Sequence, residues 1–220
     1  MKKVWTFGIL VLAAAMAVGA WWFATRRPRV VFAVPPPPAP APAGVPKDRQ
    51  VLLANRTLWV GERKRAFPAR FAQTQKPTAR GTLPYAVVCE APVTGAVRER
   101  AEKLGVRVVR FLPSNALLVE ADTAGLKKLE EDALFAAAFE ITPVDKIQRA
   151  LAERIAAGEE TPEVTVLALS QADRNALRKD VEAAGGELLQ GRLLGPCSLK
   201  ARVSADFVLE LLGRGEVTWV

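Results

Sequence analysis

The sequence predicts an α+β protein made of two tandem modules with one shared order of elements: strand, helix, strand, strand, helix, strand. Three observations predict this. An apolar helix face recurs at a constant offset, a glycine ends both copies of that helix, and strand-like runs surround each copy in the same order. The modules are expected to follow an N-terminal transmembrane helix and a proline-rich linker.

The repeated helix face carries the argument for a duplication. Val97, Ala101 and Leu104 have the i, i+4, i+7 spacing of one helical face, and Gly105 ends the pattern. The same face and the same stop recur 80 residues later, at Leu177, Val181, Ala184 and Gly185. Chance likeness between two unrelated α+β domains is the alternative explanation.

Strand-like apolar runs occupy matching places in the two copies. In the first copy they lie at 85–89, 106–111, 116–121 and 135–139. In the second copy they lie at 164–169, 187–192, 198–203 and 217–220. Each copy therefore has one strand before its first helix, two after it, and one at its end.

A second helix completes each copy. It is expected over 124–131, opened by Asp122 or Thr123, and over 205–213, opened by Ser204, because such side chains accept bonds from the first free amides of a helix. The resulting β-α-β-β-α-β order is ferredoxin-like. The sequence thus predicts two tandem ferredoxin-like βαββαβ modules. Their bounds are 82–147 and 163–220, and a connecting helix lies between them at 148–162.

An apolar run at 4–24 opens the chain after two lysines. As a helix it would be about 31 Å long, which matches the hydrocarbon core of a bilayer. Trp21 and Trp22 lie near its end, where interfacial aromatic residues are common. We expect an uncleaved signal anchor within residues 1–25. A signal peptide cleaved near 18–20 is the alternative, and the flanking charges do not distinguish the two membrane orientations.

Residues 26–81 are predicted to be a proline-rich and basic linker. Seven of the twelve residues at 35–46 are proline, which favours a semi-rigid polyproline II spacer of about 37 Å. Residues 47–81 are polar and basic. We expect little packed structure there, apart from short strand candidates at 50–53 and 57–60.

Charge and composition exclude several classes of function. The chain has 220 residues, a net charge of +8 and no histidine, so no triad or Cys-His site based on imidazole can form within it. Residues 1–81 hold 14 basic and 2 acidic side chains, whereas residues 82–220 hold 17 and 21. A nucleic-acid-binding fold would carry its basic face on the folded part, so we expect no nucleic-acid partner. No metal-ligand spacing or phosphate-loop motif is present, so we expect no cofactor, metal or small-molecule substrate.

Several stretches resemble the region that precedes the catalytic domain in bacterial subtilisin-type serine peptidases. The similarity is greatest over 104–119, where a leucine-glycine pair is followed by a strand, the aromatic Phe111, and a turn that contains Pro113 and Asn115 before the next strand. Similar stretches lie at 85–94, at 143–147, and over the second copy at 164–220. These motifs are strand and turn patterns within residues 81–220, not catalytic signatures.

The resemblance implies a fold like that of the propeptide inhibitors of subtilisins, which act as intramolecular chaperones and temporary inhibitors. We therefore expect a membrane-anchored module that is not an enzyme. It would bind, chaperone or inhibit a subtilisin-type peptidase, or form the N-terminal part of one. Its body would be exported from a bacterial cell, to the periplasm or beyond, or be secreted after signal cleavage. The alternative is a membrane-anchored interaction or scaffold module unrelated to proteolysis.

The predicted strands carry few polar residues on either face. Helices cover only one face of a ferredoxin-like sheet, and large exposed apolar patches are unusual, so we expect the second face of each sheet to be covered as well. It could be covered by the other module, by residues 50–60, or by a protein partner. For a partner, the candidate contact residues are Tyr85, Val87, Leu118 and Glu120.

Two pairs of residues have side chains that could form a disulfide or a nucleophile-base pair. Cys89 and Cys197 lie in different modules, where they either pair in an oxidising compartment or stay buried as thiols. Ser198 and Lys200 are a formal nucleophile and base. Because they lie two apart on a predicted strand, packing and surface roles explain them better.

Overall fold

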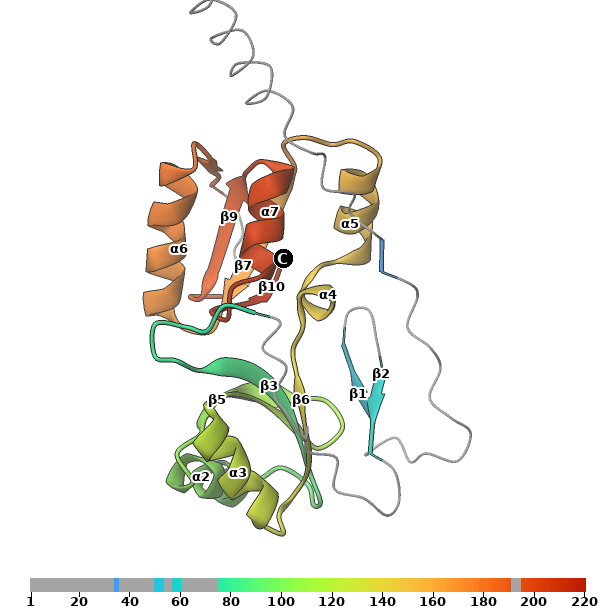
Figure 1. Ribbon diagram of the computed structural model, residues 1–220, viewed down its shortest axis with the longest axis vertical. Coiled ribbons are helices and arrows are strands. Elements are labelled where there is room, and N and C mark those ends of the chain that lie inside the picture. The colour runs from blue at the N-terminus through green and yellow to red at the C-terminus, as the bar shows by residue number, and fades with distance from the viewer. Residues whose placement is uncertain (1–33, 36–49, 54–56, 61–74, 191–194) are drawn as a thin grey trace, which may run out of the picture. The chain divides into compact units, whose positions relative to one another are not determined.

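The computed structural model describes residues 34–35, 50–53, 57–60, 75–190 and 195–220, all within the second of the chain's two compact units, Met1–Phe32 and Ala33–Val220 (Figure 1). This described part is a mixed α+β structure with antiparallel sheets and six helices, so the predicted fold class is confirmed at that level. None of these helices is long and apolar enough to cross a membrane. The predicted span at 4–24 and the proline-rich stretch at 36–46 lie outside the described residues.

The first sheet is formed by four strands and is flanked by two helices. Its elements are β3 (Leu83–Cys89), α2 (Gly95–Lys103), β4 (Arg107–Leu112), β5 (Ala116–Ala121), α3 (Thr123–Glu131) and β6 (Phe135–Glu140). The strands lie in the order β4-β5-β3-β6, and every neighbouring pair is antiparallel. Each strand and helix predicted for this part of the chain is confirmed, with small differences at the ends.

The second sheet repeats this arrangement. Its elements are β7 (Glu163–Ala168), α6 (Gln171–Ala183), β8 (Glu187–Leu188), β9 (Ser198–Arg202), α7 (Ala205–Leu212) and β10 (Val217–Trp219). The order is β10-β7-β9-β8, again antiparallel throughout. Taken by position in the chain, the strands of both sheets lie in the order 4-1-3-2. Of the described residues in the strand predicted at 187–192, Glu187 and Leu188 pair regularly with β9, and residues 191 and 192 lie outside the described part.

Local signals for the helix ends are confirmed. Of the two candidate caps for α3, Asp122 is the one used, and its carboxylate accepts a bond of 2.7 Å from the Gly125 amide. Ser204 caps α7 in the same way. Gly105 and Gly185, the two predicted stops, have φ angles of +89° and +75°, a conformation that glycine adopts without strain.

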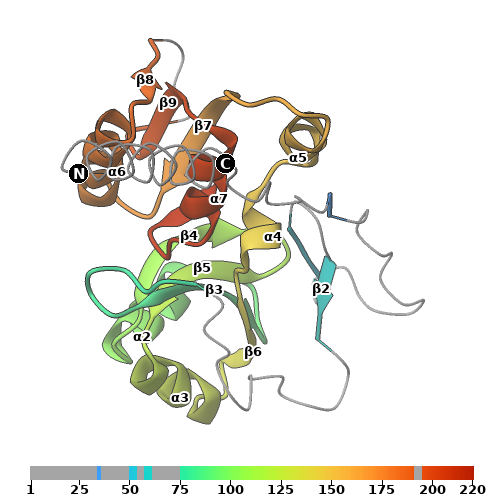
Figure 2. The ribbon, with the colours of Figure 1, turned by 45° about the horizontal axis from the view of Figure 1, so that its top comes forward.

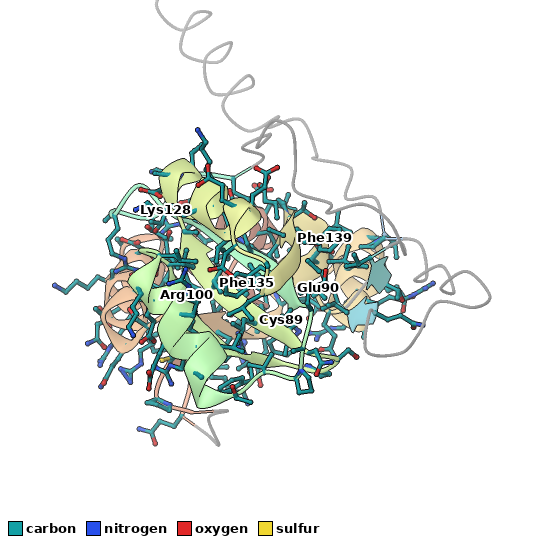
Figure 3. The ribbon with its side chains drawn as sticks, turned by 90° about the horizontal axis from the view of Figure 1, so that it is seen from below. Cys89, Glu90, Arg100, Lys128, Phe135 and Phe139 are labelled. Atoms are coloured by element: carbon teal, nitrogen blue, oxygen red, sulfur yellow. The ribbon has the colours of Figure 1, made fainter. Side chains whose placement is uncertain are left out.

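Both faces of the first sheet are covered, as expected. On one face, α2 and α3 pack over a core that includes Val87, Leu117 and Phe135 (Figure 2). In Figure 3, Phe135 and Cys89 lie near these helices, while the labelled Arg100 and Lys128 come from α2 and α3. The helix layer therefore forms the main core of the first module.

The opposite face of the first sheet is covered by a β-hairpin. Strands β1 (Gln50–Leu52) and β2 (Thr57–Trp59) pair antiparallel, and Val51, Leu58 and Val60 are buried against this face. The sheet contributes small side chains there, including Ala86 and Ala137. The short strands expected at 50–53 and 57–60 are therefore confirmed, and of the three possible covers of this face it is residues 50–60 that occupy it.

The second sheet has only one well-buried face. Val164, Val166 and Ala168 are buried on the helix side, whereas Thr165 and Leu167 of the same strand are half-buried. Ion pairs between Lys200 and Glu163 (2.5 Å) and between Arg202 and Glu187 (2.6 Å) lie on the face of Thr165, as the β7–β9 and β8–β9 register requires. The expectation that both faces of this sheet are covered is met only in part, because Ser198, the register partner of Leu167, is buried on this face while the charges near its edge stay accessible.

The connection between the sheets holds two short helices, α4 (Pro143–Lys146) and α5 (Arg149–Ala156). Thr142 caps α4 through a capping box with Asp145, whose carboxylate accepts bonds from the Thr142 amide and hydroxyl at 2.7 and 2.6 Å. Leu151, Ala152 and Ile155 form the buried face of α5. The connecting helix predicted at 148–162 is confirmed, but it ends sooner.

Candidate functional site: the junction between the two sheets

The four predicted contact residues are all buried, and they do not share a face. Tyr85, Val87, Leu118 and Glu120 are each no more than 3% exposed. Tyr85 and Val87 belong to the core under α2 and α3, whereas Leu118 belongs to the core under the hairpin. Tyr85 and Val87 point to the helices and not to the opposite face of the sheet, because alternate residues of a strand point to opposite faces. Contact of these residues with a partner stays a prediction.

The nucleophiles considered by residue type have structural roles. Cys89 and Cys197 are both free cysteines, and burial raises the pKa of the Cys89 thiol to about 12, so it stays protonated at neutral pH. The Ser198 hydroxyl donates to the Gly195 carbonyl at 2.7 Å. Lys200 pairs with Glu163 rather than with Ser198. Within the described part of the chain, no group of three or more cysteines and carboxylates could hold a metal ion.

Glu120 is the centre of a buried ion cluster on β5. Its carboxylate accepts bonds from Arg80 Nε at 2.6 Å, from Arg80 Nη2 at 3.0 Å and from Arg107 Nε at 2.6 Å, and also from the Thr82 hydroxyl. Burial alone would raise the pKa of this carboxyl, but the bonds from Arg80, Thr82 and Arg107 outweigh it, and the pKa is lowered. Arg80 also reaches Asp173 of α6 at 3.2 Å, so the cluster connects the two sheets.

The segment that contains Arg80 is a strap between the two sheets. The Lys76 amide donates to the Gly213 carbonyl at 2.8 Å, and the Gly215 amide donates to the Lys76 carbonyl at 2.7 Å. A Cβ added at Gly215 would lie 2.9 Å from the Lys76 carbonyl oxygen and 3.1 Å from the Thr78 amide nitrogen. Glycine is therefore required where strap and turn approach closely. These residues fall in the predicted linker, so the expectation of little packed structure fails here.

A second strap runs through α4 and carries a buried lysine. Lys146 is 0% exposed, and its Nζ donates to the Arg214 carbonyl at 2.5 Å. Burial lowers the pKa of this amine to about 7, against the attraction of Glu216, Glu140 and Asp145. The backbone on either side is paired, because the Val220 amide donates to the Lys146 carbonyl at 2.7 Å and the Gln148 amide donates to the Val220 carbonyl at 2.9 Å.

Arg214 anchors the turn that both straps contact. Its guanidinium pairs with Asp180 at 2.5 Å, with Glu210 at 2.6 Å and with Glu216 at 3.6 Å, and lies 5.9 Å from the ring centroid of Phe207. Burial would lower the pKa of this guanidinium, but its carboxylate partners raise it above the ordinary value. The turn of residues 213–215 is thereby fixed to α6 and α7, and the straps fix it to the first sheet.

The junction holds the two modules together through contacts from both straps. Glu120, Arg80 and Arg214 are ion-paired there, and Lys146 is hydrogen-bonded to a backbone carbonyl. Arg80 and Arg214 come from segments that the sequence predicts to be a linker and a turn. Sequence reasoning missed Lys146, Arg214 and Gly215. The only signal was the Gly-Arg-Gly sequence at 213–215, which is equally typical of an ordinary turn.

Comparison of the chain with family models, with curated proteins and with solved structures finds no match.

Proposed function

We propose that the chain is a non-catalytic, membrane-anchored pair of ferredoxin-like modules that binds a subtilisin-type serine peptidase or forms the N-terminal part of one. The observation that carries the proposal is the 4-1-3-2 antiparallel strand order of both sheets, each with two helices in βαββαβ sequence. The resemblance of residues 104–119 to peptidase propeptides adds the partner class. Fold alone does not specify function, so a binding experiment must decide.

The proposed docking face is the side of the first sheet opposite α2 and α3. Ala86, Val88 and Leu118 line it, and most of its side chains are small, which allows a partner element to approach the backbone closely. In the chain alone the hairpin β1–β2 occupies this face through Val51, Leu58 and Val60. Peptidase binding on this face would therefore compete with the hairpin.

A second function is favoured by the same hairpin. A sheet face that is already covered in cis by the chain's own residues needs no partner, and this supports the alternative of an interaction or scaffold module unrelated to proteolysis. The two functions differ in one measurable property. Only the first requires affinity for a subtilisin-type catalytic domain that increases when the hairpin is displaced.

The peptidase proposal is tested with subtilisin whose catalytic serine is replaced by alanine, so that it binds without cleaving. We expect Leu58→Asp, which places a charge in the hairpin's buried contact, to raise the affinity of the full chain at least about tenfold over the unaltered protein. The measurement is surface binding in detergent, with circular dichroism to confirm that both sheets remain folded.

The control is Lys128→Asp, which makes the exposed side of α3 more negative by two charges, against one for Leu58→Asp. It should leave the affinity for subtilisin unchanged. If neither the unaltered chain nor Leu58→Asp binds the inactive peptidase, the peptidase proposal fails and the scaffold alternative stands. If Lys128→Asp raises affinity equally, the effect is one of added negative charge and the docking face is misassigned.

For localisation we propose a single-pass anchor in a bacterial membrane at residues 4–24, with the body exported. The chain should then sediment with membranes and remain there after alkaline carbonate extraction, because a span of about 20 apolar residues is held by the hydrocarbon core. N-terminal sequencing of the recovered protein distinguishes the alternatives. A wholly soluble protein with a new N-terminus near Trp21 would identify a cleaved signal peptide instead.

A further inference from the structure

We propose that Lys146 is a proton-controlled latch between the two sheets: the neutral amine holds the turn of residues 213–215 closed, and protonation weakens this hold. The inference does not depend on the proposed function. It starts from the position of the side chain, which leaves the connection between the sheets, is fully buried, and ends on a backbone carbonyl of the second module.

The hydrogen bonding at the latch favours a neutral amine. An ammonium group has three N–H donors, and among the described residues the amine has one hydrogen-bond acceptor, the Arg214 carbonyl. The surrounding carboxylates of Glu216, Glu140 and Asp145 act on it through Coulombic attraction. That of Asp145 already accepts two bonds from Thr142. A charged lysine would therefore be buried without the bonds that normally compensate its desolvation.

The charged groups around the latch come from each element packed against it. Glu140 is the last residue of β6, and Asp145 lies in α4 itself. Arg214 lies within the turn of residues 213–215, and Glu216 follows that turn directly. Tyr85 on β3 faces Glu140, and its pKa is raised to about 12, first by burial, so it stays neutral at the pH values considered. The guanidinium of Arg214 is held by Asp180 and Glu210, and its carbonyl accepts both from the Lys146 amine at 2.5 Å and from the Val217 amide at 3.3 Å.

The direction of the pH effect follows from proton binding. With the latch closed the pKa of Lys146 is about 7, and with the amine in water it is 10.5. Between these values closure releases a proton, so closure becomes more favourable as pH rises, by up to about tenfold per pH unit. Below pH 7 both states are protonated and the dependence ends. This linkage therefore tightens the junction steadily as pH rises from about 7 towards 10.5, and loosens it as pH falls back to neutrality.

The test is hydrogen exchange on the full chain in detergent between pH 7 and pH 9, expressed as protection relative to the intrinsic exchange rate. The reporters are the amides of Lys76, Gly215 and Val220, which bond across the junction. We expect their protection to rise by up to about a hundredfold over this range. The Leu126 amide inside α3 reports on the first module itself and should not follow this rise.

Two variants separate the latch from general pH effects. Lys146→Met keeps most of the length of the side chain and removes its titratable amine, so the protection of the junction amides should lose its pH dependence. Lys200→Met removes a half-exposed lysine of the second sheet and should leave the dependence intact. Junction protection that does not change with pH in the unaltered chain, or a slope that survives in Lys146→Met, overturns the proposal.

A direct titration keeps the proposal testable if Lys146→Met does not fold. The 13Cε resonance of Lys146 in the unaltered chain should titrate near pH 7, well separated from those of the exposed lysines. A titration of Lys146 near 10.5 would show that the buried amine is charged at neutral pH, and the latch would then be an ordinary structural contact.

Discussion

Replacing Val87 with aspartate should prevent the first sheet from folding. Val87 lies on β3 and is fully buried under the helix layer, in the same core as Leu117 and Phe135. An unpaired carboxylate at this position loses its hydration and gains no partner, so we expect the free energy of unfolding to fall by more than about 4 kcal/mol. Loss of the cooperative urea transition, followed by circular dichroism, is the measurement.

Phe111→Asp is the matched control for this substitution. Phe111 lies in the same sheet, on β4, but is 54% exposed. The same charge should therefore change the free energy of unfolding by only about 0.5 kcal/mol. A Val87→Asp protein that keeps its midpoint and loses only partner binding would show that the helix-side face opens in solution. The assignment of Val87 to the core would then be incorrect.

Replacing Glu120 with glutamine should destabilise the protein by about 3 kcal/mol. The carboxylate accepts bonds from two arginines and a threonine while itself 2% exposed, and its removal leaves these donors without a charged acceptor. The estimate is at the low end for buried ion pairs because the Arg80 and Arg107 side chains remain 44% and 43% exposed and can be hydrated. The measurement is the urea midpoint at unchanged slope.

The pH dependence of Glu120→Gln provides a second readout. The folded-state pKa of Glu120 is lowered, so its stabilisation is fully present above the ordinary value of 4.5 and is lost as pH falls through the folded value. The difference in stability between the unaltered chain and Glu120→Gln should therefore shrink on acidification below pH 4.5. Glu99→Gln, on the exposed side of α2, should show neither effect. A constant difference down to low pH would contradict a charged Glu120.

Together the two clusters explain why the strap and the connection behave as parts of the fold. Glu120 fixes Arg80 to the first sheet, and Lys76 pairs with the turn of the second. Lys146 reaches that same turn from the other side. Two segments that look like linkers in the sequence thus meet at residues 213–215, and any function that requires the modules to separate must break both contacts.

The order of elements was readable from the sequence because it depends on local regularities. The spacing of Val97, Ala101 and Leu104, the stop at Gly105 and the cap at Asp122 each act within a few residues along the chain. The same holds for the absence of histidine, which excludes imidazole-based catalysis whatever the fold. These features predicted the α+β class and the duplicated order of strands and helices.

The covering of the sheets and the junction were decided only in three dimensions. The strands of Val51 and Leu58 were predictable, but the sequence left three possible covers for the sheet, and only burial against Ala86 and Val88, which come later in the chain, decides for the hairpin. Lys146 looks like a surface lysine until the Arg214 carbonyl and the turn around it are placed over its amine. Contacts between residues far apart in sequence leave no periodic pattern along the chain. Tertiary packing therefore decides what covers each face of a sheet and whether a buried amine or carboxyl is charged.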